Sequence, residues 1–200
     1  MNTPISYSPE TYKKNDGELN STLSNMFADA TYEMSNPVFN KMSGKNIDIV
    51  LLNNGGIRSI ISKGNISEKT AFELMPFENS IVVLELNGLS IIKMIDYLRK
   101  VKLQHPISGL QITLNNDYSV NEVKINGVSI ENEKKYYVAT TDYLLEGGDK
   151  MYFLAETTKT TDINYKMRDI LIDYFKKHDT LKLKSDKRFK LVAITENRTI

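Results

Sequence analysis

A glycine turn with an arginine close behind it follows one of the most apolar segments of the chain. Residues 47–52 (Ile-Asp-Ile-Val-Leu-Leu) predict a short buried strand, and Asn53, Gly55, Gly56 and Arg58 come next. Glycine permits a close backbone approach to a ligand that a Cβ would obstruct. The arginine guanidinium presents a planar fork suited to phosphate or carboxylate. The pattern indicates an anion site at a strand end, with an ordinary surface turn as the alternative.

Two further segments carry an aromatic ring beside a rigid or glycine-rich turn. Pro76 fixes the backbone just before Phe77, so the turn can present this ring as a stacking platform or as a hydrophobic plug. Tyr143 follows a predicted strand, and Asp149 comes shortly after it, behind two glycines. A carboxylate in this position can accept hydrogen bonds from a vicinal diol, as acidic residues do for ribose. It can equally bond to the amides of its own turn.

These side chains together have the chemistry of a nucleotide pocket. Arg58 suits a phosphate, Phe77 and Tyr143 suit a flat base, and Asp149 suits the ribose hydroxyls. Stacking on aromatic side chains contributes about 1–3 kcal/mol per base. The combination therefore favours nucleotide binding, although each residue alone has a simpler structural explanation.

Composition and charge restrict the classes of function. The chain has 200 residues, 40% hydrophobic and 26% charged, with a net charge of +1, which fits one globular domain and gives no electrostatic reason to expect nucleic-acid binding. The absence of cysteine excludes disulfides, thiolate metal ligands and cysteine nucleophiles. No apolar run is long enough to predict a transmembrane segment, and the N-terminal residues predict no signal peptide. We expect a soluble chain.

The histidines and the known catalytic motifs give no sign of a self-contained active site. His105 and His178 are the only histidines, and neither has a partner at metal-ligand spacing, so we expect both on the surface and no metal or other cofactor on this chain. No P-loop, nucleophile elbow or dinucleotide fingerprint occurs. We therefore predict no catalytic residue.

The pattern of apolar residues predicts the elements that position these side chains. Residues 1–18 are polar and are expected to form a loose N-terminal segment, with the domain spanning residues 19–200. The predicted helices are residues 19–35, 67–74, 89–101 and 164–178, and the predicted strands are residues 47–53, 80–86, 109–114, 120–125, 128–130, 136–144 and 189–194. Helices and hairpins mix without a regular βαβ rhythm, so the predicted class is α+β with a mixed sheet.

Several motifs, in order along the chain, resemble the C-terminal, substrate-binding domain of the 5′-nucleotidase family. Residues 23–30 resemble the helix motif Gly-Asn-Leu-Ile-Ala-Asp-Ala, and residues 53–58 resemble Asn-Gly-Gly-Gly-Ile-Arg. Residues 75–79 resemble Leu-Pro-Phe-Gly-Asn, and residues 137–149 resemble Val-Ala-Thr-Asn-Asp-Phe followed by Gly-Gly-Asp-Gly. The resemblance extends from about residue 19 to about residue 177.

The resemblance implies a single domain with a mixed sheet layered with helices, and a role for each candidate residue. Arg58 would contact the phosphate, Asn53 the nucleoside, Phe77 and Tyr143 the two faces of the base, and Asp149 the ribose. The full set of expected substrate-binding residues is Asn53, Gly55, Gly56, Arg58, Phe77, Tyr143, Gly148 and Asp149. The expected ligand is a nucleoside 5′-monophosphate or a related nucleotide.

The family also implies what the chain lacks. Complete enzymes carry an N-terminal domain that supplies two divalent metals and the water-activating residues, and no part of this sequence resembles it. We therefore expect a chain that is inactive alone and recognises nucleotides for a separate metallophosphoesterase domain or subunit. A non-catalytic nucleotide- or nucleoside-binding module and a purely structural domain are the alternatives. The resemblance favours the periplasm or the cell surface and leaves the cytoplasm open.

Some positions depart from the family pattern. Lys13 and Lys14 stand where the family places phosphate-binding arginine, and an ammonium cannot grip phosphate in a bidentate way. Glu78 and Lys150 replace glycines, and Tyr143 replaces phenylalanine. We expect weaker phosphate affinity or an altered nucleoside preference.

Overall fold

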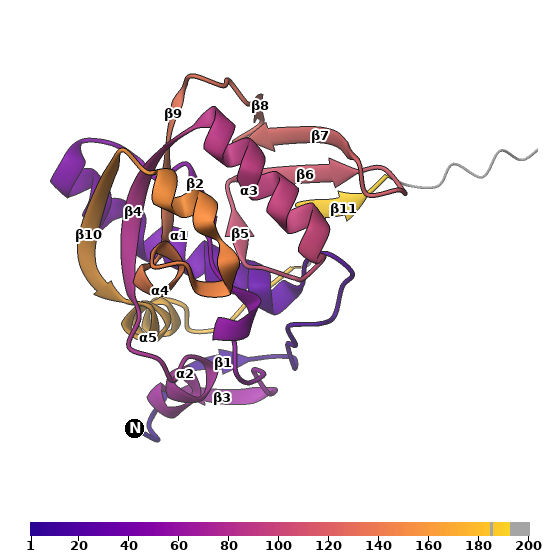
Figure 1. The fold of residues 1–200 in the computed structure, drawn as a ribbon. Coiled ribbons are helices and arrows are strands. Elements are labelled where there is room, and N and C mark those ends of the chain that lie inside the picture. Colours follow the sequence, from indigo (N-terminus) through magenta and orange to yellow (C-terminus); the bar gives the residue numbers. More distant parts are fainter. Residues whose placement is uncertain (185, 193–200) are drawn as a thin grey trace, which may run out of the picture.

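The computed structural model describes residues 1–184 and 186–192 as one α+β domain, which confirms the predicted class (Figure 1). The strands are β1 (Pro4–Ser8), β2 (Ile49–Leu51), β3 (Gly64–Ser67), β4 (Ser80–Asn87), β5 (Ile107–Ser108), β6 (Leu110–Leu114), β7 (Val120–Ile125), β8 (Val128–Ser129), β9 (Lys135–Thr141), β10 (Lys159–Lys166) and β11 (Phe189–Leu191). The helices are α1 (Thr22–Ser43), α2 (Glu68–Leu74), α3 (Gly88–Val101), α4 (Asp142–Leu145) and α5 (Met167–Lys177), with 3₁₀ turns η1 (Asn54–Gly56), η2 (Gly148–Lys150) and η3 (Tyr152–Glu156).

A mixed central sheet with the strand order β10-β4-β9-β2-β5 organises the domain. Strand β2 runs parallel to β9, whereas β4 runs antiparallel to β9. Because side chains alternate along a strand, Ile81 and Val83 of β4 join one hydrophobic cluster and Val82 and Leu84 join the other. The sheet is therefore covered on both faces.

Helices on the two faces complete two hydrophobic cores. Helices α1, α2 and α5 pack in the first core, and α3 packs in the second, together with β6. In Figure 1, α1 and α3 lie on opposite sides of the sheet. The apolar stripes predicted for α3 and α5 from helical spacing face these cores, through residues such as Ile95 and Ile170.

A second sheet with the strand order β11-β6-β7-β8 extends the domain on the α3 side. Arg188, just before β11, is largely buried and holds this C-terminal segment to the rest of the domain. Its Nη1 and Nη2 donate to the carboxylate of Asp29 on α1 at 2.7 Å and 2.9 Å, and Nη1 also donates to the Ile107 carbonyl at 2.8 Å. The arginine therefore joins α1, β5 and the C-terminal segment.

The prediction of a loose segment at residues 1–18 is wrong for part of its length. Strand β1 pairs with β3 in a separate two-stranded antiparallel sheet. The ring of Tyr12 is buried, and its backbone N–H donates to the Ile61 carbonyl at 2.8 Å. Backbone pairing holds this segment, and it leaves little apolar alternation for sequence analysis to detect.

Several element boundaries also differ from the predictions. Helix α1 passes through Pro37 and extends to Ser43, beyond the predicted end at residue 35. The strand predicted to reach residue 144 ends at Thr141, and α4 begins at Asp142. Strand β10 was not predicted, because it is a polar edge strand with mostly exposed side chains. The predicted strand 189–194 is observed as β11, and its residues 193 and 194 lie outside the described part of the chain.

Candidate functional site

Three segments far apart in the sequence meet at one edge of the central sheet and enclose a cavity of about 250 Å³. The carboxyl ends of the parallel strands β2 and β9 lie at this edge, and so does the start of β4, because β4 runs antiparallel to β9. The residues that line the cavity are Asn53, Gly55, Gly56, Arg58, Phe77, Asn79, Tyr143 and Asp149. The structure thus brings all the expected site residues except Gly148 to one cavity, and it adds Asn79.

The turn after β2 is held by its own side chains and by α2. A Cβ added at Gly56 would lie 3.0 Å from Oδ1 of Asn53, so the Asn53 side chain covers the turn closely and glycine leaves it room. The backbone N–H of Arg58 donates to the Leu74 carbonyl at 2.9 Å. This bond fixes the end of the turn against α2.

Arg58 presents an exposed guanidinium at the cavity, with its Cζ 5.7 Å from the centroid of the Phe77 ring. Its Nη1 donates a long hydrogen bond, 3.4 Å, to the Gly55 carbonyl. Within residues 1–184 and 186–192, no carboxylate forms a salt bridge with Arg58. Its charge can therefore meet an anion at the cavity mouth without first leaving a carboxylate partner.

The two lysines upstream of α1 do not line the cavity. Lys14 donates from Nζ to the Ile57 carbonyl at 2.9 Å, and its Nζ lies 3.5 Å from the Asn54 carbonyl, so it braces the back of the glycine turn. Lys13 is exposed. Arg58 is thus the cation that faces the cavity among the described residues.

Phe77 lines the cavity from the segment between α2 and β4. Helix α2 ends at Leu74, and the Phe77 side chain remains 42% exposed. Its neighbour Glu78 forms ion pairs with Lys166 and Arg168. Hydrogen bonds from Lys166 and Arg168 lower the pKa of Glu78 to about 2. The carboxylate that replaces the family's glycine is therefore paired outside the cavity lining.

Tyr143, on α4, provides the second ring, and its side chain is 43% exposed. A Cβ on Gly148 would lie 2.4 Å from Cε1 of this ring, so Gly148 makes room for Tyr143 without lining the cavity itself. The Tyr143 hydroxyl donates to Oδ1 of Asp149 at 3.2 Å. Gly148 thus acts on the site through the ring it accommodates.

Asp149 lies in a strained turn supported from behind by α3. Asp149 and Lys150 have φ values of 51° and 61°, in the left-handed region. The glycine that Lys150 replaces in the family would adopt this conformation without a Cβ penalty. The hydroxyl of Tyr97 donates to the Asp149 carbonyl at 2.8 Å. This hydrogen bond ties the acidic turn to α3.

The expectation that both histidines lie on the surface is wrong for His105. Its ring is 2% exposed and lies 5.9 Å from the ring of Tyr97. Its Nδ1 accepts a hydrogen bond from the backbone N–H of Asn54, at 3.2 Å, so it supports the glycine turn. Burial lowers the pKa of His105, because the charged imidazolium is poorly solvated there. His178 is only partly buried, and its Nε2 lies 3.0 Å from Glu33.

The described residues offer no cluster of side chains suited to a metal ion. Within the part of the chain that the structure describes, no three His, Cys, Asp or Glu side chains gather where they could hold a metal ion. The imidazole of His105 is already bonded to Asn54. The described residues also include no helix with the length and apolar character needed to cross a membrane.

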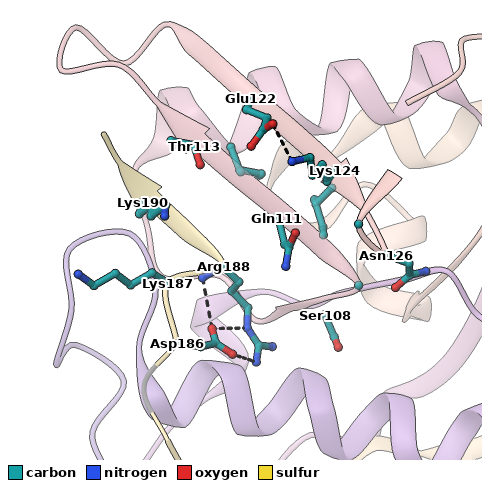
Figure 2. A pocket seen from close by; sticks show the side chains of 14 residues that line it. Ser108, Gln111, Thr113, Glu122, Lys124, Asn126, Asp186, Lys187, Arg188 and Lys190 are labelled. Atoms are coloured by element: carbon teal, nitrogen blue, oxygen red, sulfur yellow. Dashed lines mark hydrogen bonds and ion pairs between the residues drawn. The ribbon is translucent and has the colours of Figure 1, made fainter. Parts of the chain in front are cut away.

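A larger cavity, of about 490 Å³, lies over the second sheet (Figure 2). Its charged side chains largely pair with each other: Lys124 with Glu122 at 2.8 Å, and Arg188 with Asp186 at 2.5 Å. None of the described residues that line it is aromatic. The smaller cavity therefore has the more specific recognition chemistry.

The chain is similar to a known protein family and to several curated proteins. The family model described as "5′-nucleotidase, C-terminal domain" matches residues 4–156. The cell wall protein Lmo0130 of Listeria monocytogenes is 32% identical over 144 residues, covering 64% of this chain and 18% of its own. The trifunctional nucleotide phosphoesterase protein YfkN of Bacillus subtilis is 33% identical over 143 residues, covering 64% of this chain and 10% of its own.

A solved structure supports the fold. The crystal structure of a 5′-nucleotidase precursor from Thermus thermophilus matches with a TM-score of 0.82 and 23% identity, covering 96% of this chain and 40% of that one. The chain spans only 10% to 30% of the length of the curated relatives that it matches.

Proposed function

The chain belongs to the family of 5′-nucleotidase C-terminal domains, and on this premise we propose that it recognises a nucleotide for hydrolysis by a separate catalytic unit. The observation that carries the proposal is the convergence of Arg58, Phe77, Tyr143 and Asp149 on one cavity. A cation, two rings and a carboxylate match the phosphate, base and ribose of a nucleoside 5′-monophosphate.

The proposed roles follow from the contacts of each side chain. Arg58 binds the phosphate, since its guanidinium lies at the cavity and has no carboxylate partner among the described residues. Phe77 and Tyr143 stack on the base from exposed ring faces. Asp149 accepts hydrogen bonds from the ribose hydroxyls, and Asn53 bonds to the nucleoside from the glycine turn.

Calorimetric titration with AMP and adenosine tests the proposal. We expect AMP to bind. Phe77→Ala should lower the affinity for AMP and for adenosine about tenfold, because one stacking face is lost. Arg58→Ala should lower the affinity for AMP by a similar factor and leave the affinity for adenosine unchanged, because only AMP carries the phosphate.

Two substitutions away from the cavity serve as matched controls. Tyr32→Ala removes a similarly exposed ring on α1, and Arg99→Ala removes a guanidinium on α3 that pairs with Asp96 at 2.5 Å. Both should leave the two affinities unchanged. A wild-type chain that binds neither AMP nor adenosine would refute nucleotide recognition.

A separate metallophosphoesterase domain or subunit is the second part of the proposal. The described residues hold no metal cluster, and the curated relatives are several times longer than this chain. We propose that this partner carries two divalent metals and performs the hydrolysis. Mixing the chain with a metallophosphoesterase should raise AMP hydrolysis above that of either protein alone. The Listeria relative is by name a cell wall protein, which supports a location at the cell surface.

A nucleoside-binding module without a catalytic partner is the second candidate. The position of Lys14 favours it, because its ammonium bonds to the Asn54 and Ile57 carbonyls instead of facing the cavity. Among the described residues that line the cavity, Arg58 is then the single cation, so phosphate could contribute little to binding. This candidate predicts equal affinity for adenosine and AMP, and an Arg58→Ala variant that binds both as the wild type does. A marked preference for AMP would instead support the nucleotidase role.

A further inference from the structure

The two ring-bearing segments of the cavity are joined by one carboxylate that does not line it. Asp142 is the first residue of α4 and directly precedes Tyr143. We propose that Asp142 is a positioning residue that sets the spacing between the Phe77 and Tyr143 rings, an inference that rests on the proposed nucleotide site. Neither the family match nor the resemblance assigns a role to this residue.

The hydrogen bonds of Asp142 cross from α4 to the segment that follows Phe77. Its Oδ1 accepts from Nδ2 of Asn79 at 3.1 Å and from the backbone N–H of Tyr143 at 2.7 Å. Its Oδ2 accepts from the backbone N–H of Ser80 at 3.1 Å. One side chain therefore restrains both sides of the cavity.

The position of Asp142 just beyond the β4–β9 ladder explains why a side chain is needed there. The β4–β9 ladder includes the pair Ile81 and Thr141, after which β9 turns into α4. The carboxylate of Asp142 then accepts from Ser80, the residue preceding Ile81. It continues the attachment of β4 beyond the point where the backbone of β9 leaves the sheet.

Asp142 also orients Asn79, which lines the cavity. The bond from Nδ2 of Asn79 to the carboxylate fixes which way the amide points, since an amide has its donor and its acceptor on different atoms. Hydrogen bonds to an ionised carboxylate are shorter and stronger than those between neutral groups. Loss of the carboxylate would release both the Asn79 amide and the start of β4.

Other contacts of the Phe77 segment lead away from Tyr143. Glu78 pairs with Lys166 and Arg168, and the Asn79 carbonyl accepts from the Met167 N–H at 2.9 Å. These bonds attach the segment to β10 and α5. Among the side-chain hydrogen bonds of the described residues, those of Asp142 are the ones that connect residues 75–80 to residues 142–149.

Asp142→Asn is the informative substitution, because it preserves size and removes one acceptor. Three N–H donors, from Asn79, Ser80 and Tyr143, face the carboxylate, so the new amide nitrogen must face at least one of them. Asp162→Asn is the matched control. Asp162 lies on β10 and accepts from the Asn164 N–H of the same strand, at 2.7 Å, and it does not line the cavity.

Titration with AMP and with ribose 5-phosphate separates positioning from general damage. We expect Asp142→Asn to lower the affinity for AMP about tenfold and to leave the affinity for ribose 5-phosphate unchanged, because only binding of the base depends on the ring spacing. Asp162→Asn should change neither. An equal loss of affinity for both ligands, or an unchanged affinity for AMP, would overturn the proposal.

A measurement without ligand keeps this inference separate from the proposed function. NMR signals of the Phe77 and Tyr143 rings should both shift in Asp142→Asn, with the melting temperature recorded in parallel, and should stay in place in Asp162→Asn. Ring signals that do not move would overturn the positioning role of Asp142, whether or not the wild-type chain binds a nucleotide. If the wild-type chain binds no nucleotide but the ring signals move, the proposed function is refuted and the role of Asp142 in spacing the two rings stands.

Discussion

At the scale of single residues, His105 shows how a buried group supports the site without lining it. Because Nδ1 accepts the Asn54 N–H, the neutral ring carries its proton on Nε2. Protonation would put an N–H group on Nδ1, so that two donors, this group and the Asn54 N–H, would face each other. It would also place a positive charge on a buried ring. The glycine turn therefore depends on a neutral imidazole.

This dependence predicts a change of stability with pH. The pKa of His105 in the folded state is lower than the unfolded value of about 6.5. The stabilisation of the folded state by the neutral ring is therefore complete above that pH, and it is lost as the pH falls through the folded pKa. The free energy of unfolding should therefore decrease as the pH is lowered from about 7 to about 5. Urea denaturation at several pH values in this range measures the free energy of unfolding.

The two histidines allow a matched control for the pH experiment. His105→Gln keeps an acceptor for the Asn54 N–H and removes the titrating ring, so the pH dependence should become flatter. His178→Gln, at the partly buried histidine, should retain it. An unchanged slope in His105→Gln would show that another group is responsible.

Residue types predicted most of the cavity, and contacts explain what was missed. Arg58, Phe77, Tyr143 and Asp149 carry chemistry that is visible from their types and from adjacent glycines or proline. Asn79 was missed because an asparagine before a strand carries no distinctive signal. Its place in the quoted motif was the one available clue.

At the scale of secondary-structure elements, the turn from Gly147 to Lys150 sets the space available to the Tyr143 ring. Gly148→Ala places a Cβ 2.4 Å from Cε1 of Tyr143 and 2.6 Å from its carbonyl oxygen. The ring and the turn must separate. We expect a loss of roughly 1–3 kcal/mol in stability, as for other overpacked sites, together with weaker nucleoside binding.

Gly55→Ala is the comparison for this substitution. Its nearest contact would be Nδ2 of Asn53 at 3.4 Å, which is an ordinary van der Waals distance. Its melting temperature should remain close to that of the wild type, whereas Gly148→Ala should melt several degrees lower. Equal melting temperatures would contradict the steric argument.

The elements that sequence analysis predicted are those with an apolar stripe or a turn signal. Helix α3 was predicted closely because Asn87 caps it and its buried face repeats at helical spacing. Strands β1 and β10 were not predicted, because backbone pairing holds them while many of their side chains face solvent. Sequence analysis assigns the start of helix α4 to the end of a strand, because its four residues are too few to show a helical repeat of apolar side chains.

At the scale of the whole molecule, Arg188 holds distant parts of the chain together. Its bonds to Asp29 and to Asp186 raise the pKa of the guanidinium further above its ordinary value, although burial opposes this. Arg188→Leu would leave these partly exposed carboxylates without their cation. We expect a loss of roughly 2 kcal/mol in the free energy of unfolding, less than for a fully buried pair.

Lys187 offers the control for this prediction, since it is an exposed cation next to Arg188. Denaturant unfolding of Lys187→Leu should agree with wild type within about 0.5 kcal/mol. The nucleotide affinity of Arg188→Leu should stay normal, because this arginine lines the larger cavity and not the candidate site.

The meeting of the site segments could not be derived from local pattern alone. The expectation that residues near 55, 77 and 145 share a pocket rests on their chemical types and on the resemblance to a known family. The physical cause is the topology: β2 and β9 run parallel and β4 runs against them, so two strand ends and one strand start share an edge. Pairing between strands distant in the sequence is not encoded in any short window.

The half-exposed rings of Phe77 and Tyr143 have a thermodynamic consequence. In the ligand-free domain both rings keep hydrated apolar faces at the cavity. A base that slides between them removes those faces from water, so the heat capacity of association should be negative and the binding enthalpy should become more exothermic on warming. A ligand held by Arg58 alone would show little of this temperature dependence.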